Sequence, residues 1–175
     1  GRIVVVGAGK AAGQMVRGLE DALGDRIDSG IVVTKDDHTV PTRHVELHTA
    51  AHPVPDSRGV AATASMLELV RGLNANDVVF VLLSGGGSAL LVAPVEGVSL
   101  ADKQSTTSAL LACGATIDEI NSVRKHLSRV KKKPSSAKHP CDGSDNTGKT
   151  VSTGLYFSRI EAGLAVQTRK LVYVR

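Results

Sequence analysis

The sequence predicts an α/β fold in which a mostly parallel sheet is flanked by helices. Short apolar runs alternate with stretches of helical spacing along the first three quarters of the chain, as they do in successive βαβ units. Val78–Leu83 is the clearest strand, because a continuous apolar run bounded by turn residues is typical of a buried parallel strand. At 175 residues the chain is long enough for one such domain with a sizeable core.

The elements that precede this strand are predicted in order along the chain. A strand at Arg2–Val6 is followed by an amphipathic helix over Ala11–Leu23, whose apolar residues recur at helical spacing. Further strands are expected at Gly30–Thr34 and Val45–His48. These segments form the first βαβ unit and its neighbouring strand.

A proline-rich turn, His52-Pro53-Val54-Pro55-Asp56, interrupts the alternation. Each proline forces the residue before it into an extended conformation, so this segment cannot be helical. Asp56 is then well placed to act as the N-cap of a helix over about Ser57–Leu73.

Helices dominate after Pro94. Ser99 and Asp102 resemble a capping box at the start of a helix over Leu100–Cys113. The next helix begins near Ala115, and it carries one amide and three basic side chains at Asn121, Arg124, Lys125 and His126. We expect these four residues to lie largely on one side, opposite Ile120, Val123 and Leu127. Such a face either clamps an anion or is an ordinary solvated surface.

The segment Lys131–Arg175 differs from the rest of the chain in composition. It opens with the linker-like Lys131–Ser136, and its strand candidate Leu171–Val174 is weak, so we expect it to be largely irregular. The net charge is −3 through Ser128 and +7 from Arg129 onward. A solvated basic end is favoured over a nucleic-acid or membrane contact, because aromatic residues and amphipathic spacing are lacking.

The composition argues against several classes of protein. The chain has no Trp, two Phe and two Tyr, which is too few for an aromatic platform that binds single-stranded nucleic acid. We expect no leader segment, and no apolar stretch of the sequence approaches the roughly 18 residues of a membrane span. Cys113 and Cys141 provide neither a disulfide framework nor a zinc site. We therefore expect a cytoplasmic protein with reduced thiols and with no membrane or nucleic-acid partner.

Glycine-rich turns follow two of the predicted strands. Gly7-Ala8-Gly9-Lys10 comes after the first strand, and Ser84-Gly85-Gly86-Gly87-Ser88 comes after Val78–Leu83. Glycines let the backbone approach a ligand closely, and unpaired N–H groups at such turns attract anions. The sequence therefore predicts a crevice for a phosphate or a carboxylate. The hydroxyls of Ser84 and Ser88 would donate to that anion or help to hold a magnesium ion.

Two other nucleotide motifs are weaker. Gly7, Gly9 and Gly13 resemble a dinucleotide fingerprint whose third glycine is one position late, with Asp36 or Asp37 as the ribose-binding acid. Lys10 argues against this fingerprint, because a lysine at the start of the helix suits anion binding better than it suits the close approach of a dinucleotide. The segment 143–150 matches the P-loop expression, but it lacks a buried strand before it and a convincing helix after it, so we interpret it as a chance match.

Four segments together resemble a known family, the MOFRL-associated glycerate 2-kinases, which are also described as DUF4147 and sometimes labelled hydroxypyruvate reductases. The matching segments are Val5–Ala12, His52–Asp56, Leu82–Leu91 and Gly114–Ser128. The resemblance covers roughly residues 2–131, and it is specific because all four segments are in register.

The resemblance implies a Rossmann-like N-terminal domain and a kinase reaction. Members of the family transfer the γ-phosphoryl group of ATP to the 2-hydroxyl of (R)-glycerate, with Mg²⁺, to give 2-phosphoglycerate. Lys10 matches the lysine that acts on the transferring phosphate, and the glycine-rich turns match the segments that bind phosphate or the substrate carboxylate. Residues of the cleft-lining helix face are matched by Asn121, Arg124, Lys125 and Ser128. His52 and Asp56 match a motif with a structural or substrate-orienting role.

The chain also departs from the family. The resemblance ends at Lys131, where the sequence continues with Lys132-Lys133-Pro134. We expect a family-like domain over residues 1–131 and an unrelated tail over residues 132–175, from a truncated or frameshifted reading frame or from a fusion. The family's second domain, which forms the other wall of the cleft, is expected to be missing, so activity alone would be weak or absent. The alternatives are a non-catalytic nucleotide- or anion-binding module and an NAD(P)-dependent hydroxypyruvate reductase.

Overall fold

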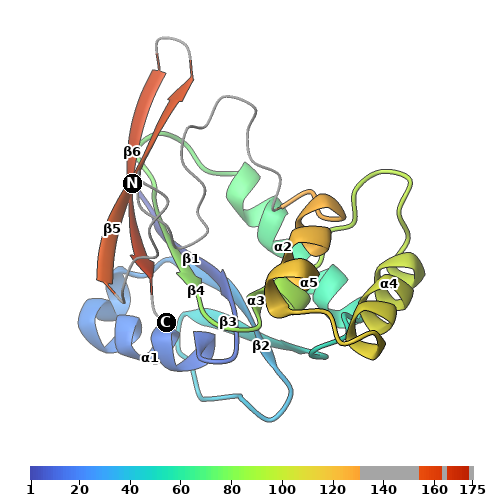
Figure 1. Ribbon diagram of the computed structural model, residues 1–175. Coiled ribbons are helices and arrows are strands. Elements are labelled where there is room, and N and C mark those ends of the chain that lie inside the picture. Colours follow the sequence, from blue (N-terminus) through green and yellow to red (C-terminus); the bar gives the residue numbers. More distant parts are fainter. Residues whose placement is uncertain (131–153, 163–164, 174–175) are drawn as a thin grey trace.

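The computed structural model describes residues 1–130 and the strand segments 154–162 and 165–173, and it has an α/β architecture (Figure 1). One sheet has the strand order β3-β2-β1-β4-β6-β5. Its strands are β1 (Ile3–Ala8), β2 (Ser29–Lys35), β3 (Val45–Ala50), β4 (Val78–Leu83), β5 (Gly154–Ala162) and β6 (Ala165–Tyr173). The first four are parallel to their neighbours, which confirms the predicted fold class.

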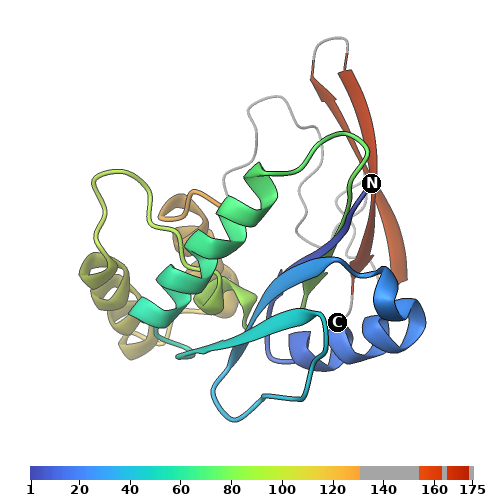
Figure 2. The ribbon, with the colours of Figure 1, turned by 180° about the vertical axis from the view of Figure 1, so that it is seen from behind.

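The helices cover both faces of the sheet. They are α1 (Ala12–Leu23), α2 (Ser57–Arg71), α3 (Gly87–Leu90), α4 (Leu100–Ala112) and α5 (Ile117–His126), with a short 3₁₀ turn η1 (Gly24–Arg26) after α1. α1 packs on one face and α2 on the other, as the views from the front and from behind show (Figures 1 and 2). No helix within the described residues has both the length and the apolar character needed to cross a membrane.

The strands of the sheet contribute alternate residues to two cores, because successive side chains of a strand point to opposite faces. Val4 and Val6 of β1 pack with Met66 of α2 in one core. Val5 packs with Val16 of α1 in the other. β1 and β2 are therefore buried from both sides, as expected for central parallel strands. β4 is less buried than its apolar run predicted, since Leu82 is buried, Val79, Phe80, Val81 and Leu83 are half-buried and Val78 is exposed.

The sheet changes its winding direction between β1 and β4. From β1 the chain passes through α1 to β2, which lies on one side of β1, and then to β3 beyond it. It then passes through α2 to β4, which lies on the opposite side of β1. Ligands of open α/β sheets bind outside the carboxyl ends of the strands at such a switch point. Both glycine-rich turns lie here, since one follows β1 and the other follows β4.

Two segments of the tail differ from the irregular structure expected there. β5 and β6 form an antiparallel hairpin. β6 also pairs in parallel with β4, through Leu82 with Val172 and Leu83 with Tyr173. The motif at 143–150 lies outside the described residues.

Candidate functional site

The two glycine-rich turns contact each other through backbone hydrogen bonds. The N–H of Lys10 donates to the carbonyl of Gly85 at 2.8 Å, and the N–H of Ser84 donates to the carbonyl of Ala8 at 3.2 Å. The hydroxyl of Ser84 accepts from the N–H of Ala11 at 3.0 Å. Lys10 and the Ser84–Ser88 turn are thus held together at one edge of the sheet, as the sequence predicted.

Glycine is required at two positions of this junction. Gly9 has a φ of +144°, and a Cβ there would lie 2.1 Å from Oγ of Ser84. Gly86 has a φ of +85°, and its Cβ would lie 3.0 Å from the ring of His52 and 3.3 Å from Cγ of Lys10. Side chains would force the turns apart, so the absence of Cβ atoms allows the close approach.

The junction leaves hydrogen-bond donors free. Within the described part of the chain, the N–H groups of Gly85 and Gly86 and the ammonium of Lys10 have no hydrogen-bond partner. α1 begins two residues after Lys10 without a side-chain N-cap and without an acidic residue in its first turn. Free amides, an uncapped helix start and a lysine at one edge are a suitable environment for an anion.

The proline-rich turn after β3 brings His52 to the same edge. Its half-buried ring lies beside Gly86 and the Lys10 side chain. Burial lowers the pKa of His52, and the charges of Lys10, Arg124 and Lys35 lower it further. The imidazole is therefore neutral near pH 7.

α5 contributes a buried cation next to this turn. Arg124 is only 7% exposed, and its Nη2 donates to the carbonyl of Pro53 at 2.8 Å. Burial lowers the pKa of Arg124, although a guanidinium still keeps its charge. No carboxylate in the described part of the chain forms an ion pair with Arg124.

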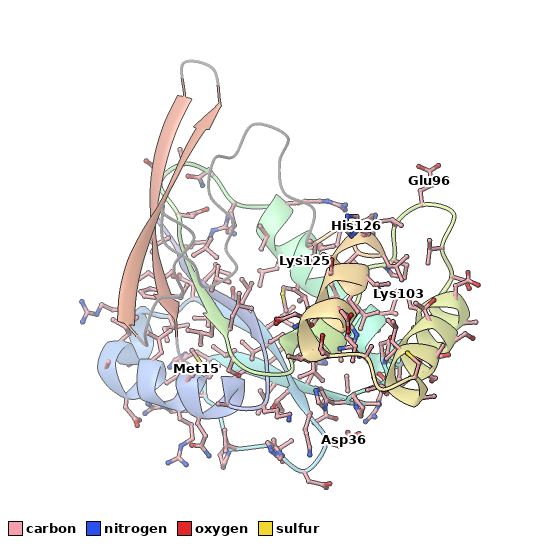
Figure 3. All side chains as sticks on the ribbon, in the orientation of Figure 1. Met15, Asp36, Glu96, Lys103, Lys125 and His126 are labelled. Carbon is pink, nitrogen blue, oxygen red and sulfur yellow. The ribbon has the colours of Figure 1, made fainter. Side chains whose placement is uncertain are left out.

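The predicted polar face of α5 is wrong in one respect. Arg124 lies on the buried side of the helix together with Ile120, not opposite to it. Lys125 and His126 are exposed, and the His126 ring bonds to the carbonyl of Ser122 at 2.8 Å (Figure 3). Positions 120 and 124 are four residues apart, so they lie on the same face of the helix. Packing against the His52 turn buries that face.

The remaining residues of that face lie at different depths. Asn121 is half-buried, whereas Ser128 is 1% exposed and its Oγ has no hydrogen-bond partner among the described residues. Lys103 of α4 was not predicted by any sequence pattern. It is 6% exposed, lies between α4 and α5, and donates from Nζ to the carbonyl of Leu127 at 2.9 Å (Figure 3). That carbonyl ends α5, where a cation is favourable.

The nearby acids are held by one arginine. Nη1 and Nη2 of Arg58 contact the carboxylate of Asp36 at 2.6 and 2.8 Å, and its Nε contacts Asp56 at 2.7 Å. The hydrogen bonds from Arg58 lower the pKa of Asp36. Asp56 also accepts from the N–H of Gly59 at 3.0 Å, which confirms it as the N-cap of α2. Neither acid forms an ion pair with Lys10, Lys35 or Arg124.

The arrangement is therefore cationic and carries free amides. The described residues contain no group of three or more His, Cys, Asp or Glu side chains placed to hold a metal ion. Asp36, which was expected to bind a ribose in a dinucleotide site, is instead held by two hydrogen bonds from Arg58. These contacts favour an anion site over a dinucleotide site.

The fold and this edge define an α/β domain whose candidate site lies at the switch point of its sheet. Residues 1–132 match the family described as "Domain of unknown function (DUF4147)", and the chain belongs to that family. This confirms the resemblance seen in the sequence.

Relatives and a solved structure agree with the assignment. The chain is 52% identical over 131 residues to a D-glycerate 2-kinase of Thermotoga maritima, a match covering 74% of this chain and 31% of that protein. It is 49% identical over 131 residues to a putative hydroxypyruvate reductase of Agrobacterium vitis, covering 75% and 34%. The crystal structure of the glycerate kinase from Thermotoga maritima superimposes with a TM-score of 0.66, again covering 74% of this chain and 31% of the other. The chain thus spans about a third of the length of the curated relatives it matches.

Proposed function

We propose that this chain provides one wall of a glycerate 2-kinase active site, in which the γ-phosphoryl group of ATP is transferred to the 2-hydroxyl of (R)-glycerate to give 2-phosphoglycerate. The observation that carries the proposal is the junction of the two glycine-rich turns beside Lys10, where the amides of Gly85 and Gly86 have no partner among the described residues. The homology to glycerate kinases over the same residues supports the choice of reaction.

Lys10 is the residue to which we assign the transferring phosphate. Phosphoryl transfer depends mainly on positioning and on stabilising charge that spreads over the phosphate oxygens. The ammonium of Lys10 has no partner in the described part of the chain, so it is available for such an oxygen. The free amides of Gly85 and Gly86 would bind further oxygens of the phosphate or the substrate carboxylate.

The other site residues would shape and charge the cleft. Arg124 would contribute positive charge behind the His52 turn, and Asn121, Lys125 and Ser128 would line its side of the cleft. His52 would contact the ligand at Gly86. Asp56 would act indirectly, since it caps α2 and binds Arg58.

The residues present fit a polyphosphate better than they fit a free metal ion. Amides and cations suit the phosphates of ATP, which supplies the transferable phosphoryl group when bound. Among the described residues, Asp36 and Asp56 are held by Arg58, and no three or more His, Cys, Asp or Glu side chains are placed together to hold a metal ion. We therefore assign no magnesium ligand to this wall.

The reaction of the isolated chain is expected to be weak. A closed site excludes water and completes the set of catalytic groups, and this chain spans about a third of the length of its relatives. Incubation with ATP, Mg²⁺ and (R)-glycerate should therefore give little or no 2-phosphoglycerate, whereas calorimetry should show saturable ATP binding. Robust turnover would contradict the proposed need for a second wall.

Lys10→Ala is the first test of the site. In the isolated chain it should weaken ATP binding at least tenfold, because one charged contact to phosphate is lost. The control is Arg17→Ala, which removes an exposed cation on α1 and should leave the affinity unchanged.

The equivalent alanine substitution in the full-length kinase of Thermotoga maritima separates catalysis from binding. It should lower kcat/KM by about a hundredfold or more while leaving the unfolding temperature unchanged. Unchanged kinetics would contradict the role of Lys10. Saturable ATP binding by the isolated chain, together with an unaffected full-length variant, would instead favour a non-catalytic binding module.

A further inference from the structure

His52 lies where an anion bound at the glycine-rich turns would contact it. Cδ2 and Nε2 of its ring are each 3.0 Å from the point where a Cβ of Gly86 would be. The Lys10 side chain reaches the same point to within 3.3 Å at Cγ. Gly86 also carries one of the free amides, so ring, amide and ammonium belong to one small region.

Charged groups face this ring from several elements. Lys10 comes from the turn after β1, Lys35 from the end of β2, and Arg124 from α5. Arg124 donates to the carbonyl of Pro53, the residue after His52, at 2.8 Å. Burial lowers the pKa of Lys103 of α4, and the charge of Arg124 lowers it further. The acids on the other side, Asp36 and Asp56, are each bonded to Arg58.

The positive charges are therefore not balanced by an ion pair within the described residues. Partial burial lowers the pKa of His52, and the three cations around the ring lower it further. A doubly charged anion at the junction would offset those cations and would itself attract a proton. Binding of the anion and protonation of the ring must then favour each other, because such coupling is reciprocal.

We propose that His52 takes up a proton when an anion binds between the two glycine-rich turns, so that this site captures its ligand together with a proton. The inference rests on the anion site of the proposed function and adds a proton-linked residue to it. It follows that anion affinity falls as the pH rises. The fall occurs between the pH at which the free ring titrates and the higher pH at which the ring beside the anion titrates.

The other nearby charges cannot replace His52 in this window. Lysine and arginine stay protonated between about pH 5 and pH 8. Hydrogen bonds from Arg58 lower the pKa of Asp36. Burial tends to raise the pKa of Asp56, but hydrogen bonds from Gly59 and Arg58 outweigh it and lower the pKa. Both carboxylates therefore remain charged throughout.

The experiment uses the full 175-residue chain and inorganic sulfate, whose two charges do not change over the pH range. Sulfate binding is measured by calorimetry from about pH 5 to pH 8, at each pH in two buffers with different ionisation enthalpies. The wild-type chain should take up a fraction of a proton, up to one, per sulfate. Its Kd should rise by up to tenfold per pH unit within the window and level off on either side.

His52→Gln keeps a polar side chain but cannot take up a proton. It should bind sulfate with a Kd that is independent of pH and with the same heat in both buffers. The matched control is His126→Gln, because His126 is exposed on α5 and bonds to Ser122 instead of facing the turns. That control should behave like the wild type.

A second measurement keeps the test valid if His52→Gln fails to fold. The imidazole signals of the wild-type chain are followed by NMR against pH with and without sulfate, and His52 is assigned by replacing the other five histidines one at a time. Its titration midpoint should lie below that of an ordinary histidine without sulfate and should move upward with it.

The outcomes distinguish this inference from the proposed function. Sulfate binding with a flat pH profile, or proton uptake that persists in His52→Gln, would overturn the role of His52 and leave the anion site intact. Absence of sulfate binding would overturn the inference, and absence of both sulfate and ATP binding would overturn the proposed function as well.

Discussion

Gly9 is the residue at which the turn after β1 meets the turn after β4. Its φ of +144° is in a region that L-residues rarely adopt, and the space beside its Cα is occupied by Oγ of Ser84. That same Oγ accepts the N–H of Ala11. The missing side chain thus allows Ser84 to bond to the start of α1 and to hold the two turns in contact.

Gly9→Ala should separate the turns and destabilise the fold. A Cβ placed 2.1 Å from Oγ of Ser84 must displace it, and the backbone strain adds to that cost. We expect a loss of about 2 kcal/mol or more in the free energy of unfolding, measured by urea denaturation, together with weaker ATP binding.

Gly18→Ala is the matched control for this substitution. Gly18 is exposed within α1, and a Cβ there would meet nothing within 4 Å. Replacing a helical glycine by alanine should stabilise the chain by about 0.5–1 kcal/mol. Equal stabilities of the two variants would show that the contact between the turns is unimportant.

At the scale of elements, α1 is tied to the loop before β3 through one buried carboxylate. Glu20 is 2% exposed, and it accepts the N–H groups of Arg43, His44 and Val45 at 2.8 to 3.2 Å. Burial tends to raise the pKa of Glu20, but the backbone hydrogen bonds outweigh it and the pKa is lowered. These hydrogen bonds attach α1 to the residues that lead into β3, the edge strand of the sheet.

Glu20→Gln should weaken this attachment, because an amide has a single acceptor oxygen for three backbone donors. We expect a loss of about 1–3 kcal/mol in the free energy of unfolding at pH 7. The pKa of Glu20 is lower in the folded chain than its ordinary value of 4.5. Its charge therefore stabilises the fold fully at pH values above 4.5, and this stabilisation is lost as the pH falls below 4.5 toward the folded-state pKa.

The stability difference between wild type and variant should therefore narrow between about pH 5 and pH 3, which denaturation at each pH will measure. Glu68→Gln, on the exposed face of α2, is the control and should have little effect at any pH. A pH-independent difference would mean that the charge of Glu20 is unimportant.

At the scale of the whole molecule, the parallel strands β3-β2-β1-β4 lie within residues 1–130, and so do the core residues whose burial the structure describes. β6 joins this unit through two residue pairs with β4. The glycine-rich turns, the His52 turn and α5 also belong to residues 1–130. The unit that carries the candidate site is thus assembled by those residues.

A chain that ends at Val130 should therefore keep its fold and its ATP affinity. Hydrogen exchange should show β1 and β2 as strongly protected as in the full chain, because neither strand pairs with β6. Exchange in β4 should increase near Leu82 and Leu83, where two residue pairs with β6 are lost. Loss of protection in β1 would show that the remaining residues are needed for folding.

Much of the site follows from local sequence signals, and some of it does not. The strand Val78–Leu83, the Asp56 N-cap and the Ser99–Asp102 capping box were all predicted and are present. Each depends on residues within a few positions of one another. The capping box of Thr116 and Glu119 at the start of α5 is an equally local signal, although it is not among the predicted features.

The burial of two charged side chains could not be predicted from neighbouring residues in the sequence. Arg124 and Lys103 are buried because the His52 turn and the end of α5 lie against them, and helical spacing alone assigned Arg124 to the wrong side of its helix. Arg58 likewise binds Asp36 from another element, and no spacing relates these two residues.

The sequence by itself determined the alternation of strands and helices, the two glycine-rich turns and the family, because these depend on periodicity and on residues that are near neighbours in the chain. Only the tertiary structure decided which cations face His52 and which acids are held by Arg58. Those groups come from separate elements, and the packing of the elements alone sets the distances over which their charges act.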